Sequence, residues 1–158
     1  MSLTKSQKDN LNTLINTLEM GEYNQTRGIL RRGDCYCIGG VMCDISGMGE
    51  WGRVLHETAL KNEFIGEDGF CFHPNVEAED FNFFPDRQYI GAVPSVVQVY
   101  YGMTDEAMSV LMDANDNDAP FRTMATALEQ YIECDGEGEE WMNALRPYLP
   151  QPWEEARI

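Results

Sequence analysis

Near the N-terminus, apolar residues recur at the spacing of one helix face, at Leu11, Leu14, Ile15 and Leu18. Thr4 or Ser6 is positioned to cap the start of this helix, and Gly21 is positioned to end it. The pattern therefore predicts an N-terminal helix that buries one apolar face.

The C-terminal half predicts further helices. Pro94 stands at the first turn of one that ends near Gly102. Thr104 caps the next, which ends near Asn115, and Asp118 caps a longer one. The buried faces of these two helices carry Ala107, Met108, Leu111 and Met112, and then Phe121, Met124, Leu128 and Ile132. A last short helix carries Trp141 and Leu145 and precedes Pro147.

The middle of the chain predicts short strands and a short helix. Residues 26–30 and 34–37 favour two strands of a small hairpin around a turn at residues 31–33. Residues 38–45 predict a short buried helix, in which Gly39 and Gly40 allow another backbone to approach closely.

The chain between that helix and Tyr89 is harder to assign. Residues 47–52 should break the short helix, and residues 53–60 favour another helical turn or two. Between Phe64 and Tyr89 we expect loop with one strand, in which Phe70 and Phe72 alternate with Cys71 and His73.

Together these elements predict the α+β class, as one mostly helical domain over residues 1–158 with a small β-hairpin and short strands. Residues 64–89 are interpreted as an aromatic and acidic insertion, and residues 133–140 as an acidic linker. Residues 150–158 are expected to fray as a tail.

The charge of the chain narrows the classes of partner. Asp and Glu number 27 against 11 Lys and Arg, which gives a formal charge of -16. This field disfavours nucleic acid, whereas it suits a basic protein partner or plain solubility. We expect no membrane anchor, because no apolar run approaches the roughly 20 residues of a spanning helix. Five cysteines and no signal peptide predict a reducing, cytoplasmic location; the oligomeric state is left open.

Cysteine and histidine spacing offers one candidate metal site. Cys35 and Cys37, and likewise Cys71 and His73, would each point two ligands to one face of a strand, a donor set that suits tetrahedral zinc. The gaps are shorter than zinc sites ordinarily use, and buried cysteine is commonly a small apolar residue. We therefore expect no cofactor, with zinc as the alternative.

The basic residues offer one candidate ligand site. Arg27, Arg31 and Arg32, with Asp34 beside them and glycines nearby, could cradle a nucleotide or another phosphorylated ligand. The alternative is that these arginines pair with the abundant carboxylates.

Three other patterns are weaker candidates for a functional site. The acidic string from Asp113 to Asp118 begins like a calcium loop but lacks the glycine and the glutamate that such a loop requires. Asp34 and Asp44 could form a carboxylate pair, although both also suit turn and helix-end positions. Cysteine nucleophile chemistry would need His56 or His73, and neither lies in a recognisable motif.

Two stretches carry recognisable elements, residues 27–44 and residues 93–97 followed by 111–116 and the helix to 132. Residues 30–44 read L-R-x-G-D-x-x-C-x-x-G-x-x-C-D, and Asn115-Asp116 is an Asn-Asp pair that precedes a final helix. Together they resemble an uncharacterised family of small phage, prophage and bacterial proteins. The resemblance implies kinship without an established activity. The aromatic insertion and the acidic tail depart from the family pattern.

The function that these patterns favour is binding without catalysis. The leading hypothesis is a phage-type accessory factor that presents an acidic surface to a protein partner. The alternatives are a binder of phosphorylated small molecules and a small enzyme. The last is the weakest, since no nucleophile, base and orienting group fall into a known arrangement.

Overall fold

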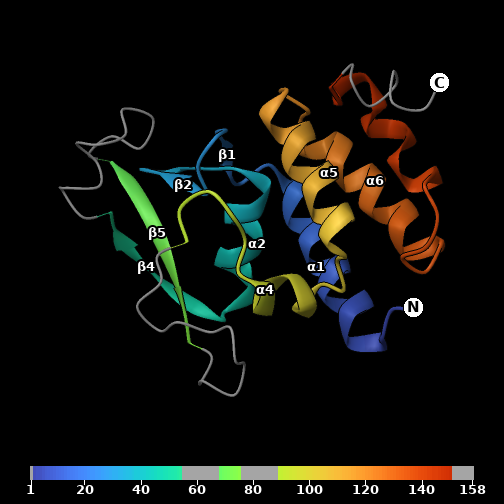
Figure 1. Cartoon of the computed structure of the whole chain (residues 1–158), viewed down its shortest axis with the longest axis horizontal. Coiled ribbons are helices and arrows are strands. Elements are labelled where there is room, and N and C mark those ends of the chain that lie inside the picture. The colour runs from blue at the N-terminus through green and yellow to red at the C-terminus, as the bar shows by residue number, and fades with distance from the viewer. Residues whose placement is uncertain (1, 55–67, 76–88, 151–158) are drawn as a thin grey trace. The chain divides into compact units, whose positions relative to one another are not determined.

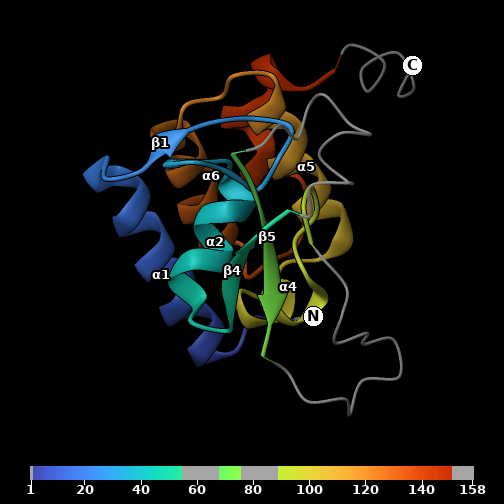
Figure 2. The ribbon, with the colours of Figure 1, turned by 90° about the vertical axis from the view of Figure 1, so that its left-hand side faces the viewer.

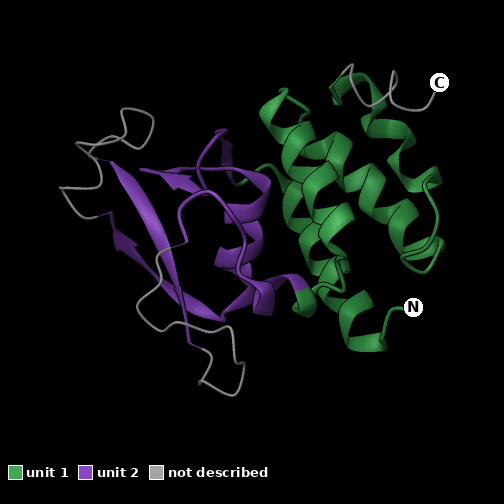
Figure 3. Cartoon of the chain, viewed as in Figure 1, with its two compact units in different colours: residues 1–22, 99–158 green, residues 23–98 purple. Residues whose placement is uncertain are grey.

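The computed structural model describes residues 2–54, 68–75 and 89–150 (Figure 1). It confirms the α+β class, with several helices, a small hairpin and short strands. The chain forms two compact units, one from residues 1–22 and 99–158 and one from residues 23–98 (Figure 3). Among the helices of the described residues, none has the length and the apolar character to cross a membrane.

The first unit is helical and begins with α1 (Lys5–Met20). The Thr4 side chain accepts a hydrogen bond from the Gln7 backbone N–H, and the Gln7 side chain accepts one from the Thr4 N–H, which forms a capping box. Gly21 ends the helix at φ 70°, a conformation that glycine adopts without strain. The predicted helix and its buried apolar face are confirmed.

The remaining helices of this unit complete its core. They are α5 (Asp105–Asp116), α6 (Phe121–Glu133) and the 3-10 helix η1 (Glu140–Tyr148), while α4 (Ser95–Tyr100) lies where the chain passes between the units. α6 packs against both α1 and η1. The Asn10 side chain donates to the Tyr100 carbonyl, and the Tyr131 hydroxyl donates to the Gly102 carbonyl. These bonds fasten the α4–α5 connection to α1 and α6.

The second unit is built around a five-stranded mixed sheet in the order β1-β3-β2-β5-β4. Figure 2 shows β5 beside β4, with which it pairs. Its strands are β1 (Asn24–Gln25), β2 (Arg31–Arg32), β3 (Cys35–Tyr36), β4 (Gly49–Arg53) and β5 (Gly69–Pro74). β1 is parallel to β3, and the other pairs are antiparallel. β5 therefore lies between two strands that precede it in sequence.

The helix of this unit, α2 (Ile38–Ser46), packs on β4 and β3. Its glycine at position 40 is required sterically, because a Cβ there would lie 1.8 Å from the Leu30 carbonyl oxygen. The Cys37 backbone N–H donates to that same carbonyl at 3.1 Å. The predicted short buried helix and the close backbone approach are both confirmed.

Several predicted boundaries are wrong. The hairpin pairs β2 with β3, so Arg31 and Arg32 form a strand and the turn lies at residues 33–34. Arg53 belongs to β4 rather than to a helix, because glycine-rich residues 49–53 pair with β5. Pro120, not Asp118, precedes α6, and Asp118 adopts φ 69° in the turn before it. The last helix is of the 3-10 type and contains Pro147.

The stretch interpreted as an insertion contributes β5, which confirms the one strand expected there. Residues 64–67 and 76–88 of this stretch lie outside the described residues, as do residues 55–60 of the expected helical turn and residues 151–158 of the tail. The acidic linker at residues 133–140 is a turn-rich connection between α6 and η1, with Asp135, Gly136 and Gly138 at positive φ.

Candidate functional site

One face of the sheet in the second unit gathers aromatic and basic side chains. Arg31 pairs with Tyr36 on one side and with Phe70 on the other, and Arg53 is also opposite Phe70. Trp51 is opposite Phe72 on the same two strands. Directly opposed residues share a face of a sheet, as do alternate residues of one strand. All of these side chains therefore project from one face, which we call the arginine–aromatic face.

The Arg31 guanidinium lies among three rings of this face. Its central carbon is 4.1 Å from the ring centroid of Phe70, 5.0 Å from that of Tyr36 and 5.5 Å from that of Trp51. Its Nε donates to the Gly33 carbonyl at 2.9 Å. These distances are those of cation–π contacts, which stabilise the charge and fix its position in the half-buried face.

The rings are linked to one another and to α2. Tyr23, Tyr36, Trp51 and Phe72 follow one another in edge-to-face contacts, with centroids 4.9 to 5.9 Å apart. Asp44 of α2 accepts hydrogen bonds from the Tyr23 hydroxyl and, at 2.9 Å, from the Trp51 indole nitrogen. Burial raises the pKa of Tyr36, and the nearby charge of Asp44 raises it further. The Tyr36 phenol is therefore neutral near pH 7.

The opposite face of β5 carries a thiol and an imidazole in contact. The Cys71 Sγ lies 3.2 Å from the His73 Nε2 and 3.5 Å from the Gly52 carbonyl oxygen. Cys71 is fully buried and packs with Ile29 and Val54. Burial raises the pKa of the Cys71 thiol above its ordinary value, so the arrangement keeps it protonated. A protonated, buried thiol is a poor nucleophile.

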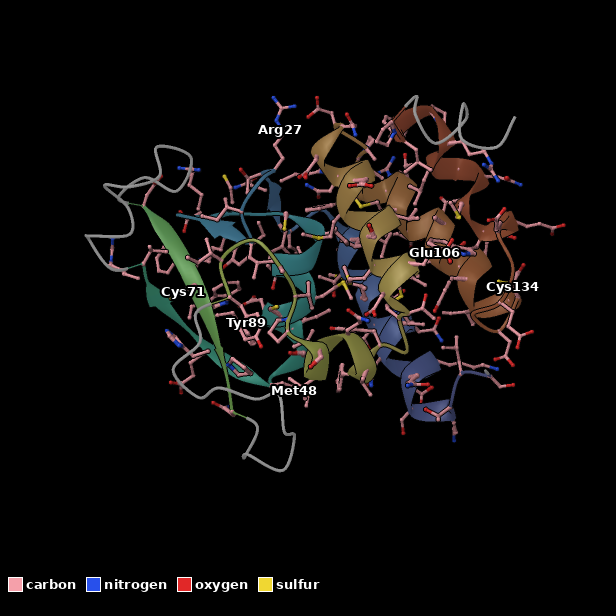
Figure 4. All side chains as sticks on the ribbon, viewed as in Figure 1. Arg27, Met48, Cys71, Tyr89, Glu106 and Cys134 are labelled. Carbon is pink, nitrogen blue, oxygen red and sulfur yellow. The ribbon has the colours of Figure 1, made fainter. Side chains whose placement is uncertain are left out.

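The predicted zinc ligands are all in the second unit, but they are not brought together as a set. Cys71, which Figure 4 labels on β5, contacts His73. Cys37 is buried at the start of α2, and Cys35 is half-buried on β3. Among the described residues no three His, Cys, Asp or Glu side chains are grouped so that they could hold a metal ion.

The structure also separates the predicted phosphate ligands. Arg31 and Arg32 are consecutive in β2, so they project to opposite faces of the sheet. Arg32 forms an ion pair with Asp68 at 3.3 Å. Arg27 is exposed and projects away from the ribbon (Figure 4), and Asp34 is exposed in the hairpin turn. Only Arg31 of these four residues lies in the arginine–aromatic face.

The helical unit carries a different feature, a group of carboxylates on the paired helices α1 and α6. Glu129 and Glu133 are one turn apart on α6, and Glu19 lies near the end of α1. A hydrogen bond with the Glu19 carboxyl raises the pKa of Glu129, and the charges of Glu19 and Glu133 raise it further. Within the described residues, no Lys or Arg forms an ion pair with any of the three. We call these three residues the carboxylate cluster.

The same unit contains a hollow of about 150 Å³. Its lining comes from the start of α5, from α6 and from η1, and consists of Thr104, Glu106, Ala107, Tyr131, Gly136, Gly138, Trp141 and Met142. Glu106 is the one charged side chain of this lining, so the hollow adds to the negative character of the unit.

Sequence reasoning did not find the partners of Arg31. Tyr23 and Trp51 are isolated aromatic residues in segments where no period indicates a strand. Tyr36 lies in the strand predicted at residues 34–37, and the alternation of Phe70 and Phe72 predicted β5 correctly. Which strand lies beside β5 depends on pairing over long sequence separations, which a local pattern does not contain.

Comparison with known proteins identifies one family. A family model described as a domain of unknown function, DUF8296, matches residues 8–132. No curated protein and no solved structure matches the chain.

Proposed function

The chain belongs to this family of domains of unknown function, and we propose, from its own residues, that it is a non-enzymatic interaction protein. In this proposal the acidic surface of the helical unit engages a basic protein partner. The resemblance to small phage and prophage proteins suggests a phage accessory factor that engages a host protein. All five cysteines are free thiols, which is consistent with work in the reducing cytoplasm.

The observation that carries the proposal is the carboxylate cluster. Folding holds Glu19, Glu129 and Glu133 together, although their mutual repulsion opposes the compact state. Residues 99–150 extend the same sign of charge, with eleven Asp and Glu against two Arg and no Lys. A basic partner would relieve the repulsion and would be steered toward the surface by it.

The test measures binding to lysozyme, used as a basic probe protein, by biolayer interferometry at low and at moderate salt. The variant E19Q/E129Q/E133Q removes the cluster. The control E137Q/E139Q/E140Q removes two charges from the connection before η1 and one from the first residue of η1, so both variants have the same net charge. We expect affinity to fall with salt and to fall much further in the cluster variant than in the control.

Two results would contradict the proposal. Equal losses in the two triple variants would mean that only net charge matters and that the cluster is not a binding surface. Binding that is absent at low salt, or that is unaffected by salt, would remove electrostatic recognition altogether.

A further inference from the structure

The arginine–aromatic face contains the half-buried guanidinium of Arg31. The Nε of Arg31 is used by the Gly33 carbonyl. Within the described residues, its two terminal nitrogens have no carboxylate or carbonyl partner. In contrast, the neighbouring Arg32 pairs with Asp68. Arg31 therefore carries a positive charge that the described residues hold in position through Nε but do not pair with a carboxylate.

The rings around Arg31 strengthen the hydrogen bonds that its charge can form with a ligand. Phe70, Tyr36 and Trp51 occupy space that water would otherwise fill, and ionic hydrogen bonds strengthen when water is excluded. Because Nε is already used, an incoming anion must approach end-on and accept from both terminal nitrogens. A carboxylate, whose two oxygens match that spacing, fits such an approach.

The surroundings also select the charge and the body of the ligand. Asp44 and Asp34 both act electrostatically on Tyr36, and the Arg53 guanidinium lies 5.4 Å from the Phe70 ring centroid on the same face, so charges of both signs lie near the site. The two carboxylates oppose a phosphate dianion more than a singly charged group. The edge-to-face run of Tyr23, Tyr36 and Trp51 offers apolar ring surface beside the guanidinium. We propose that Arg31 and these rings form a binding site for a small aromatic carboxylic acid.

The probe for this site is benzoate, titrated into the full chain labelled with ¹⁵N, and the readouts are the Trp51 indole N–H resonance and the melting temperature. Trp51 is assigned with W51F. We expect saturable shifts of the Trp51 resonance with benzoate, weaker effects with acetate, which lacks the ring, and none with benzamide, which lacks the charge. Inorganic phosphate is the fourth ligand, and tighter binding of phosphate than of benzoate would contradict the proposal.

The matched variants are R31Q and R32Q, which remove the same charge from adjacent residues on opposite faces of β2. We expect R31Q to weaken benzoate binding by about tenfold or more, because a bidentate ionic contact is lost. R32Q should bind benzoate within about twofold of the wild type. If R31Q does not fold, R31K keeps the charge and loses the forked geometry, and the same weakening is expected. No saturable binding by the wild type, or equal binding by R31K, would overturn the proposal.

Discussion

The substitution Gly40→Ala tests the closest backbone approach in the sheet unit. The added Cβ would lie 1.8 Å from the Leu30 carbonyl oxygen, whereas real Cβ contacts are essentially never shorter than 3.0 Å. The two backbone segments must therefore separate by roughly 1.2 Å, and neither atom belongs to a flexible side chain. The move also lengthens the hydrogen bond from the Cys37 N–H to the Leu30 carbonyl.

The magnitude follows from three opposing effects. Forced repacking of a buried backbone contact costs about 3 kcal/mol, and weakening the hydrogen bond costs about 1 kcal/mol. Replacing glycine by alanine inside a helix offsets about 1 kcal/mol of this cost, because alanine has the higher helix propensity. The net loss in the free energy of unfolding is therefore about 3 kcal/mol. With a urea m-value of about 2 kcal/mol/M, the midpoint should fall by about 1.5 M.

The assay is urea unfolding of wild type, G40A and the control G91A, followed by circular dichroism and tryptophan fluorescence. A Cβ on Gly91 would meet its nearest neighbour, the Gly28 carbonyl oxygen, at 3.9 Å, which is ordinary contact. G91A should therefore stay within about 0.5 kcal/mol of the wild type. If the G40A protein is insoluble while the G91A protein is soluble, the result also agrees with this steric conflict. A G40A protein as stable as the wild type would refute it.

Three further predictions concern the cap, the carboxylates and the thiols. Thr104→Ala removes the side chain that accepts from the α5 backbone and should cost about 1 kcal/mol in urea unfolding, whereas T104S should cost much less. Glu19 raises the pKa of Glu129 in the folded state. Protonated Glu129 therefore contributes to the stability of the fold below its ordinary pKa of 4.5, and this contribution is lost as the pH rises through the raised pKa. E129Q should therefore melt above the wild type at pH 7, and the difference should shrink toward pH 4; a constant difference would argue against the pairing. Iodoacetamide should modify the half-buried Cys35 in the native protein and leave the buried Cys71 intact by mass spectrometry, and equal rates at the two thiols would contradict the described burial.

The helices could be predicted from the sequence because their signals are local. Thr4 and Thr104 are capping residues followed by apolar residues at helical spacing, and both helices begin where the pattern indicates. The predicted start of α6 was wrong because aspartate is one of the residue types that most often cap a helix, so Asp118 matched the expected signal. In the structure, Asp118 instead occupies a left-handed turn before Pro120.

The sheet could be predicted only in part. β2 is two residues long, and Arg31 and Arg32 have no apolar alternation that would mark a strand. They join the sheet because β3 and β5 pair with them on either side, so this strand depends on tertiary contacts and not on the local sequence. The same cause determines the candidate site, since adjacent arginines that appear equivalent in the sequence project to opposite faces. The metal set separates for a related reason, because Cys37 lies where β3 has ended and α2 begins.

The position of α1 has a consequence for the order in which the chain acquires structure during synthesis. The partner that covers its apolar face, α6, begins at Phe121, so a ribosome must add about 100 residues after Met20 before the two helices can pair. The sheet unit, which needs residues only as far as 98, can fold in that interval. Closing so long a loop carries an entropic cost that a ready-folded middle segment reduces, because it shortens the flexible chain. The nascent protein should therefore expose Leu11, Leu14, Ile15 and Leu18 for most of its synthesis, and a chain halted before α6 should be a substrate for chaperones.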